Sequence, residues 1–404
     1  MTSWQDRAAR TVMRVRPFRG VTFTEHAGDP ADLTFTPPTS WSTLPADLLE
    51  RIDAHHILHL LAPAFGGHPA SGAERARALL RSWLDDEVLR RDAEPAMYVY
   101  AQPAGDSEVV GVIATVDLVA DGGGPFLDHE EVIAPLVDVQ ETLEQTTNAQ
   151  IEPILALCHE AAALGDVLRE IVGRPADLAV APPDVGTHRL WRIDDSAVQL
   201  RIAQAVPDAP ALIADGHHRH SAWSRVAARD GTGPATRALA LLVHAPQPGI
   251  RLGAIHRVLA DVDLATAIGS ESIDAAALPN RSAAADYLAS GPTAGCVLHS
   301  GGAYYAVVPR VPNAECAAPE LAVCHLHAGW LKQWAVADAD VGYVHGLDEA
   351  IAQTTESGVA VLLPAPRLED VMAAARDGRP LPRKATSFGP KPLVGAVFRS
   401  WLGS

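Results

Sequence analysis

The segment that most constrains the fold of this chain is a short apolar run that stops at a glycine and continues as a helix. Residues 211–214 (ALIA) suit a buried strand, and the residues after Gly216 place Ala222 and Trp223 on one helical face. Gly216 permits the sharp turn between strand and helix. The first backbone N–H groups of such a helix point outward with the positive end of its dipole, so they attract an anion. Residues 213–219 (IADGHHR) therefore predict an anion site, and nucleotide phosphate is the anion we expect there.

The polar side chains of this turn suit the same purpose. Arg219 can fork onto phosphate oxygens, and His217 or His218 can donate hydrogen bonds to them. Asp215 can cap the helix or hold a divalent cation beside the phosphate. In the alternative interpretation Asp215 only caps and the histidines bond in the interior, but so many donors at one helix start favour a functional site. A zinc site that adds His220 is weaker, because neighbouring positions at a helix start point in different directions and no HExxH spacing exists.

Length and charge limit the classes of partner. The 404 residues, 48% of them hydrophobic, can bury a large core without disulfides or metals. The net charge of −17 argues against broad attraction to nucleic acid or to an anionic membrane surface. The four cysteines have no paired spacing, no apolar run is long enough to span a membrane, and the N-terminus lacks the apolar core of a secretory signal. We expect a cytoplasmic protein with small-molecule partners, and a homodimer is compatible with the sequence.

Strands and helices are mixed along the chain. The runs 97–101 and 109–116 flank Gly105 and predict an antiparallel hairpin, and helical periodicity covers residues 45–61 and 73–91. The composition changes after Ala260. The sequence therefore predicts two domains, 1–260 and 261–404, of which the second is an α/β region.

Two further segments carry candidate residues. Glu130, in the acidic segment 128–131 (DHEE), suits general-base work or a metal ion, although acidic residues before a helix also complement its dipole. Lys384 and Lys391 lie in a proline-flanked loop and can reach phosphates as point charges, although most lysines are simply solvated. The pair 256–257 (HR) on an apolar strand favours a structural role.

Five motifs taken together resemble one bacterial and archaeal family that was long catalogued as a domain of unknown function. They are residues 15–20 (VRPFRG), 129–131 (HEE), 213–219 (IADGHHR), 255–258 (IHRV) and 382–392 (PRKATSFGPKP). That family is similar to the free-serine kinases, which share the ParB/sulfiredoxin-like fold and phosphorylate the hydroxyl of free L-serine. The resemblance implies an α+β fold, with a ParB/sulfiredoxin-like mixed-sheet core with helices, elaborated by a C-terminal α/β region. It also implies a nucleotide-dependent kinase for a small hydroxy amino acid, with ATP or ADP as the donor and Mg²⁺.

The resemblance also implies roles for single residues. Residues 215–219 look like the phosphate-binding helix start of the family, comparable to the Gly-Cys-His-Arg turn of sulfiredoxins, and Glu130 matches the acidic residue of its HE motif. Residues 37–40 read PPTS where many relatives read PPYD, which leaves the acceptor open. A ParB-like nucleotide-binding regulatory module without kinase activity is the alternative function, and a zinc hydrolase is a third. The expected catalytic residues are Glu130, Asp215 and His218, the expected nucleotide ligands are Gly216, His217, His218, Arg219, Lys384 and Lys391, and the expected metal ligands are Asp215 and Glu130.

Overall fold

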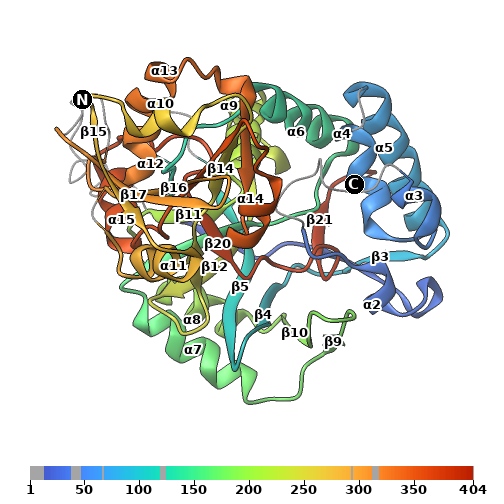
Figure 1. Cartoon of the computed structure of the whole chain (residues 1–404). Helices are drawn as coiled ribbons and strands as arrows, with labels where there is room; N and C mark the ends of the chain where they lie inside the picture. Colours follow the sequence, from blue (N-terminus) through green and yellow to red (C-terminus); the bar gives the residue numbers. More distant parts are fainter. Residues whose placement is uncertain are drawn as a thin grey trace. The chain divides into compact units, whose positions relative to one another are not determined.

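The computed structural model describes residues 13–37, 47–65, 68–118, 124–292, 294–311 and 318–403. These residues form a mixed α+β protein with several sheets (Figure 1). Contacts along the chain group into two compact units. Unit 1 comprises Met1–Leu127, Val132–Ile250 and Pro390–Ser404, and unit 2 comprises Asp128–Glu131 and Arg251–Gly389. Cys316 and most of the PPTS segment lie outside the described residues.

Unit 1 is built on a nine-stranded mixed sheet. Its strands follow the order β6-β11-β8-β12-β5-β4-β10-β9, with β1 paired to β5. The bounds are β1 Val15–Arg16, β4 Met97–Ala104, β5 Ser107–Asp117, β6 Phe126–Leu127, β8 Ile154–His159, β9 Leu178–Val180, β10 His188–Ile193, β11 Ala211–Asp215 and β12 Arg237–Ala245. Strand β12 runs parallel to β8 and antiparallel to β5, and its residues from Ala238 to Val243 are fully buried. Strands β4 and β5 form the hairpin that the sequence predicts, which is confirmed.

Helices and a second small sheet complete unit 1. The helices are α2 Pro30–Leu33, α4 Ala62–Phe65, α5 Pro69–Asp85, α6 Ala134–Thr147, α7 Ala162–Val172, α8 Ser196–Ala205 and α9 His217–Asp230. The small sheet has the order β3-β2-β21-β7, from Leu89–Arg91, Gly20–Phe23, Phe398–Ser400 and Ala149–Gln150. No helix in the described ranges combines the length and the apolarity that a membrane span needs.

The single helix predicted over residues 45–61 is wrong in its described part. That part contains a short helix α3, Leu48–Arg51, and a 3₁₀ turn, Ile57–Leu60. Between them the Asp53 side chain accepts a hydrogen bond from the His55 backbone N–H at 2.7 Å. Such local side-chain bonds compete with helix formation, which apolar periodicity alone does not reveal. The helix predicted over 73–91 is confirmed as α5, although it ends at Asp85 and residues 89–91 are the strand β3.

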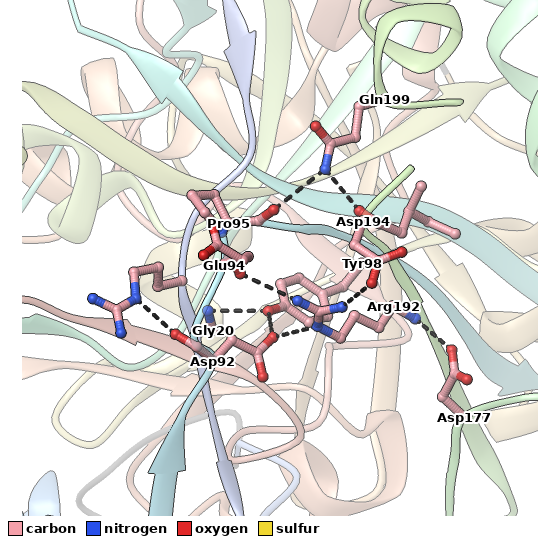
Figure 2. A network of polar contacts seen from close by, with 11 residues as sticks. Gly20, Asp92, Glu94, Pro95, Tyr98, Asp177, Arg192, Asp194 and Gln199 are labelled. Atoms are coloured by element: carbon pink, nitrogen blue, oxygen red, sulfur yellow. Dashed lines mark hydrogen bonds and ion pairs between the residues drawn. The ribbon is translucent and has the colours of Figure 1, made fainter. Parts of the chain in front are cut away.

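The N-terminal VRPFRG motif is anchored by a polar network within unit 1 (Figure 2). The Gly20 backbone N–H donates to the Tyr98 hydroxyl at 3.0 Å, that hydroxyl donates to Asp92, and Arg192 Nε donates to Asp92 at 2.7 Å. A Cβ atom on Gly20 would collide with the Tyr98 ring and hydroxyl. Burial, followed by the bond to Asp92, raises the pKa of Tyr98. The motif glycine is therefore a packing requirement of the sheet.

Unit 2 is an antiparallel sheet with short helices. The strand order is β15-β17-β16-β19-β14-β18, and a two-stranded ribbon joins β13 to β20. The strands are β13 Arg251–Gly253, β14 His256–Leu259, β15 Ile273–Leu278, β16 Cys296–Ser300, β17 Ala303–Pro309, β18 Val341–Val344, β19 Val359–Leu362 and β20 Ser387–Gly389. The helices are α10 Leu264–Ile268, α11 Arg281–Ala289, α12 Ala322–His325, α13 Leu331–Gln333, α14 Leu347–Gln353 and α15 Leu368–Arg376, and a π-helical turn, Leu326–Trp330, joins α12 to α13.

The compact units do not follow the division at residue 260 that the sequence suggests. Unit 2 already begins at Arg251, and Pro390–Ser404 belongs to unit 1. The reason is long-range pairing, because strand β21 lies between β2 and β7 in the small sheet. The Leu393 backbone N–H also donates to the Tyr100 hydroxyl at 2.9 Å. The division into two domains, 1–260 and 261–404, stays a prediction.

Candidate functional site

The predicted strand-turn-helix is confirmed. Strand β11 ends at Asp215, Gly216 has a left-handed backbone with φ of 104°, and α9 begins at His217. An L side chain would be strained at this φ, and its Cβ would lie 3.0 Å from Arg219 Nη2. The register between β11 and β8 also shifts between Ile213 and Asp215, and such a bulge re-aims the side chain that follows it. The backbone geometry therefore helps to set the direction of Asp215.

Asp215 is held between two cations. Its Oδ2 atom accepts from Arg219 Nη2 at 2.7 Å, and its Oδ1 atom lies 3.1 Å from Lys391 Nζ. The Asp215 side chain is 20% exposed. Burial opposes its ionisation, but Lys391 and then Arg219 outweigh burial and hold the pKa of Asp215 well below its usual range. This carboxylate is therefore ionised at physiological pH and is a weak base.

Arg219 is committed to contacts inside unit 1. Its guanidinium donates to Glu152 Oε2 at 2.9 Å and to the Pro153 carbonyl at 3.2 Å, in addition to Asp215. Its side chain is 11% exposed. Burial lowers the pKa of Arg219, but Glu152 and Asp215 outweigh burial and raise it. Arg219 orients Asp215 in this arrangement and does not extend a free fork outward.

Glu152 is a residue of this cluster that was not predicted from the sequence. It is 4% exposed and supplies the second carboxylate of the Arg219 pair. A signal was present, because Glu152 stands alone in the apolar run from Ile151 to Leu157. A buried charge requires a partner of opposite charge.

The histidines of the motif face different surroundings. His218 Nε2 accepts from the Ile133 backbone N–H at 3.0 Å, so this nitrogen carries no proton and only Nδ1 can donate. His217 is 4% exposed, and His220 is 9% exposed and meets the Phe126 ring edge-on at 5.4 Å. Among the described residues no three His, Cys, Asp or Glu side chains are grouped as metal ligands. The zinc alternative therefore has no support in this part of the chain.

Unit 2 brings together three motifs that are far apart in the sequence. The Leu381 backbone N–H donates to the His129 carbonyl at 2.8 Å, and the Glu131 N–H donates to the Leu381 carbonyl at 3.0 Å. His129 Nε2 and the Thr386 hydroxyl are 2.7 Å apart. The HEE segment, which contains Glu130, is thus attached to the C-terminal motif loop.

Arg257 of the IHRV motif supports the same loop. It is fully buried, and its guanidinium donates to the carbonyls of Lys384 at 3.0 Å and Arg383 at 3.3 Å. The guanidinium also lies 4.5 Å above the Tyr343 ring. Burial lowers the pKa of Arg257 to about 10, against the opposite effects of Tyr343 and Glu130. The structural role predicted for this pair is confirmed for Arg257, which holds the backbone that carries Lys384.

The predicted site residues are divided between the two units. Gly216, His217 and His218 lie in unit 1 at the start of α9, together with the cluster of Asp215, Arg219 and Lys391. Glu130 and Lys384 lie in unit 2. The catalytic, nucleotide-binding and metal-binding roles of all eight residues stay predictions.

Lysine is rare in this chain. The chain has three, at positions 332, 384 and 391. Two of them belong to the PRKATSFGPKP motif, and Lys391 meets Asp215 directly. In so lysine-poor a chain, such placement favours a specific role over a merely solvated surface.

A cavity of about 990 Å³ lies in unit 1. It is lined by residues of β2, β3 and α5, and by Asp177, whose carboxylate accepts from the Arg192 backbone N–H (Figure 2). None of the predicted site residues lines it. The size of this cavity therefore gives no reason to move the candidate site away from α9.

A comparison with protein-family models identifies the family to which the chain belongs. The family model described as "Protein of unknown function (DUF1015)" matches residues 15–322. The chain belongs to the DUF1015 family. In this DUF1015 protein the match includes the VRPFRG, HEE, IADGHHR and IHRV segments, whereas Lys384 and Lys391 lie beyond it. No curated protein matches the sequence.

Solved structures give distant likenesses to the DUF1015 chain. A conserved hypothetical protein from Pyrococcus furiosus is 14% identical with a TM-score of 0.39, over 70% of this chain and 93% of that one. A free serine kinase in complex with AMP is 14% identical with a TM-score of 0.38, over 69% and 87%. C-terminally truncated SbnI from Staphylococcus aureus is 10% identical with a TM-score of 0.42, over 72% and 89%. Identities and scores this low do not transfer an activity.

Proposed function

We propose that this DUF1015 protein is a nucleotide-dependent kinase that phosphorylates the hydroxyl of free L-serine or a similar hydroxy amino acid, with ATP or ADP as the donor. The ion pair between Asp215 and Lys391 carries the proposal. It joins two motifs of the family resemblance, IADGHHR and PRKATSFGPKP, at the N-terminus of a 14-residue helix. A helix N-terminus and a lysine together suit a phosphate group.

The phosphate would be held mainly by the first turn of α9 and by Lys391. The Lys391 side chain is 22% exposed, so its ammonium can reach an incoming anion. Arg219 would act one step further back, because its guanidinium already holds Asp215 and Glu152. In this scheme Gly216 lets the phosphate approach the backbone, and His217 and His218 shape the turn.

Phosphoryl transfer requires little covalent participation by the protein. It requires the donor and the acceptor hydroxyl in line, and charge stabilisation on the transferring oxygens. With its pKa held low, Asp215 would orient the hydroxyl by accepting its hydrogen bond and would not remove the proton early. Glu130 is the other predicted candidate for the base.

Mg²⁺ normally accompanies a nucleotide donor and neutralises charge on its phosphates. Asp215 has the right ligand chemistry, but both of its oxygens already contact cationic side chains. It would fit as a metal ligand only if Lys391 left Oδ1 for a phosphate oxygen. The residues therefore fit a cation that enters together with the nucleotide better than a resident one.

The test is product formation. The purified protein is incubated with Mg²⁺, ATP or ADP, and a panel of L-serine, L-threonine and L-homoserine, and phosphorylated amino acids are sought by mass spectrometry. O-phosphoserine that disappears in Lys391→Ala and persists in Lys332→Ala supports the proposal. Nucleotide binding in calorimetry without any phosphorylated product would instead favour the ParB-like regulatory module.

A further inference from the structure

A small cavity adjoins Arg219 inside unit 1. Its volume is about 10 Å³, close to the room that one water molecule needs. It is lined by residues of α6, of the turn between β7 and β8, and of α9, among them Glu144, Glu152 and Arg219.

Each of the three has a buried polar atom without a hydrogen-bond partner in the described part of the chain. The atoms are Glu144 Oε2, Glu152 Oε1 and Arg219 Nε. Glu144 is 1% exposed and Glu152 is 4% exposed. Roughly 90% or more of buried polar groups in folded proteins have a partner. Three residues that line one cavity and each carry such an atom therefore point to one shared partner.

We propose that this cavity is an internal water site, in which one water molecule joins Glu144 to the Glu152–Arg219 pair. The donors and acceptors balance. Arg219 Nε–H donates to the water, the water donates to Glu152 Oε1, and the third bond is made with Glu144 Oε2. Three bonds are the usual number for a buried water. A monovalent cation is disfavoured, because the Arg219 guanidinium lines the same cavity.

The water makes Glu144 a positioning residue. The other oxygen of Glu144, Oε1, accepts from Gln150 Nε2 at 2.7 Å, which leaves Oε2 for the water. From the water the connection continues through Glu152 and Arg219 to Asp215. A carboxyl on α6 thus affects the orientation of the carboxylate at the start of α9, and this consequence rests on the proposed function.

Glu144 also brings a proton into the cavity. Burial raises its pKa to about 8, Gln150 and Arg399 oppose the rise, and Asp230 and Glu141 add to it. Near neutral pH the protonated Oε2 therefore donates to the water. The folded chain holds this proton more tightly than the unfolded chain, whose ordinary value is 4.5. Stability consequently falls as the pH rises between these two values, and the loss is complete above about 8.

The first test is a high-resolution crystal structure of the full chain. A water molecule within hydrogen-bond distance of Glu144 Oε2, Glu152 Oε1 and Arg219 Nε supports the proposal. A dry cavity, or a monovalent cation recognised by its coordination and by its replacement with thallium, overturns it.

The second test is the pH profile of the thermal midpoint, in the wild type and in Glu144→Gln. The amide copies the shape of the protonated acid and can still donate to the water, so the variant should fold. We expect the wild-type midpoint to fall as the pH rises from about 4.5 to about 8, and the Gln variant to lose this slope. Asp138→Asn, an exposed change on the same helix, should keep the slope. A Gln variant with the wild-type slope overturns the assignment of the proton to Glu144.

The third readout is ATP affinity by calorimetry over the same pH range. We expect affinity to fall as Glu144 ionises in the wild type and to stay level in Glu144→Gln. If ATP affinity falls equally in both proteins, Glu144 has no positioning role. If ATP does not bind at any pH, the proposed function fails and the positioning role fails with it, whereas the water site is decided by the first two tests.

Discussion

Replacing Arg219 by alanine removes the cation that two buried carboxylates share. Glu152 is 4% exposed and the Asp215 side chain 20% exposed, so neither carboxylate can be fully solvated when the guanidinium is lost. Removing one partner of a buried ion pair typically costs about 3 to 5 kcal/mol. Lys391 remains beside Asp215 and offsets part of the loss, so we expect the free energy of unfolding to fall by about 3 kcal/mol.

The assay is urea denaturation followed by circular dichroism at neutral pH. The Arg219→Ala midpoint should fall while the slope of the transition is kept. Arg201→Ala is the matched control, because it breaks an exposed arginine–carboxylate pair with Glu170 and should change the midpoint little. Arg219→Lys should lie between the wild type and Arg219→Ala, since a lysine keeps the charge but not the fork.

The loss of stability in Arg219→Ala should depend on pH. Asp215 has a folded pKa below its unfolded value of 3.8, so its pairing stabilises the fold above that value and the stabilisation is lost as the pH falls. The difference between wild type and Arg219→Ala should therefore be largest near neutral pH and should shrink below about pH 4. A loss below about 1 kcal/mol, or a difference that is independent of pH, would refute the assignment of Arg219 as the internal partner of both carboxylates.

Three further predictions concern other parts of the two units. Lys391→Ala should weaken ATP binding in calorimetry by about 1.5 to 3 kcal/mol, as expected for a hydrogen bond from a charged group, while Lys332→Ala leaves it unchanged; equal effects would contradict the phosphate role. Gly216→Ala should lower the thermal midpoint more than Gly231→Ala, because both have positive φ but only the Gly216 Cβ would press on Arg219; the reverse order would show that the contact is harmless. Arg257→Met should expose the loop that carries Lys384 to limited proteolysis, and an unchanged cleavage pattern would remove its supporting role.

The local parts of the candidate site were predictable from the sequence. An apolar run, a glycine and a helical face define the turn at Gly216, because each signal lies within a few residues of the others. The direction of Asp215 was not predictable, since a register shift between β11 and β8 depends on pairing with a distant strand. For the same reason the sequence did not indicate that Arg219 pairs with Glu152 and Asp215 inside unit 1.

The long-range contacts were the least predictable. Nothing local indicates that Lys391 reaches Asp215, or that strand β21 completes a sheet with β2 and β7. The resemblance of the motifs indicated that these segments matter but not which segments share a unit. The structure shows that HEE and IHRV gather in unit 2 and IADGHHR in unit 1, while the C-terminal motif divides between the two after Gly389.

The place of β21 has a consequence for the order in which the chain matures. Unit 1 begins at the N-terminus but needs Pro390–Ser404 for its small sheet and for Lys391. During synthesis the strand, the turn and α9 are made well before residues 390–404, so unit 1 cannot complete its small sheet until the intervening segment 251–389 has also been made. The ammonium group beside Asp215 therefore arrives late, and the pair of Asp215 and Lys391 forms only after that whole segment has been synthesised.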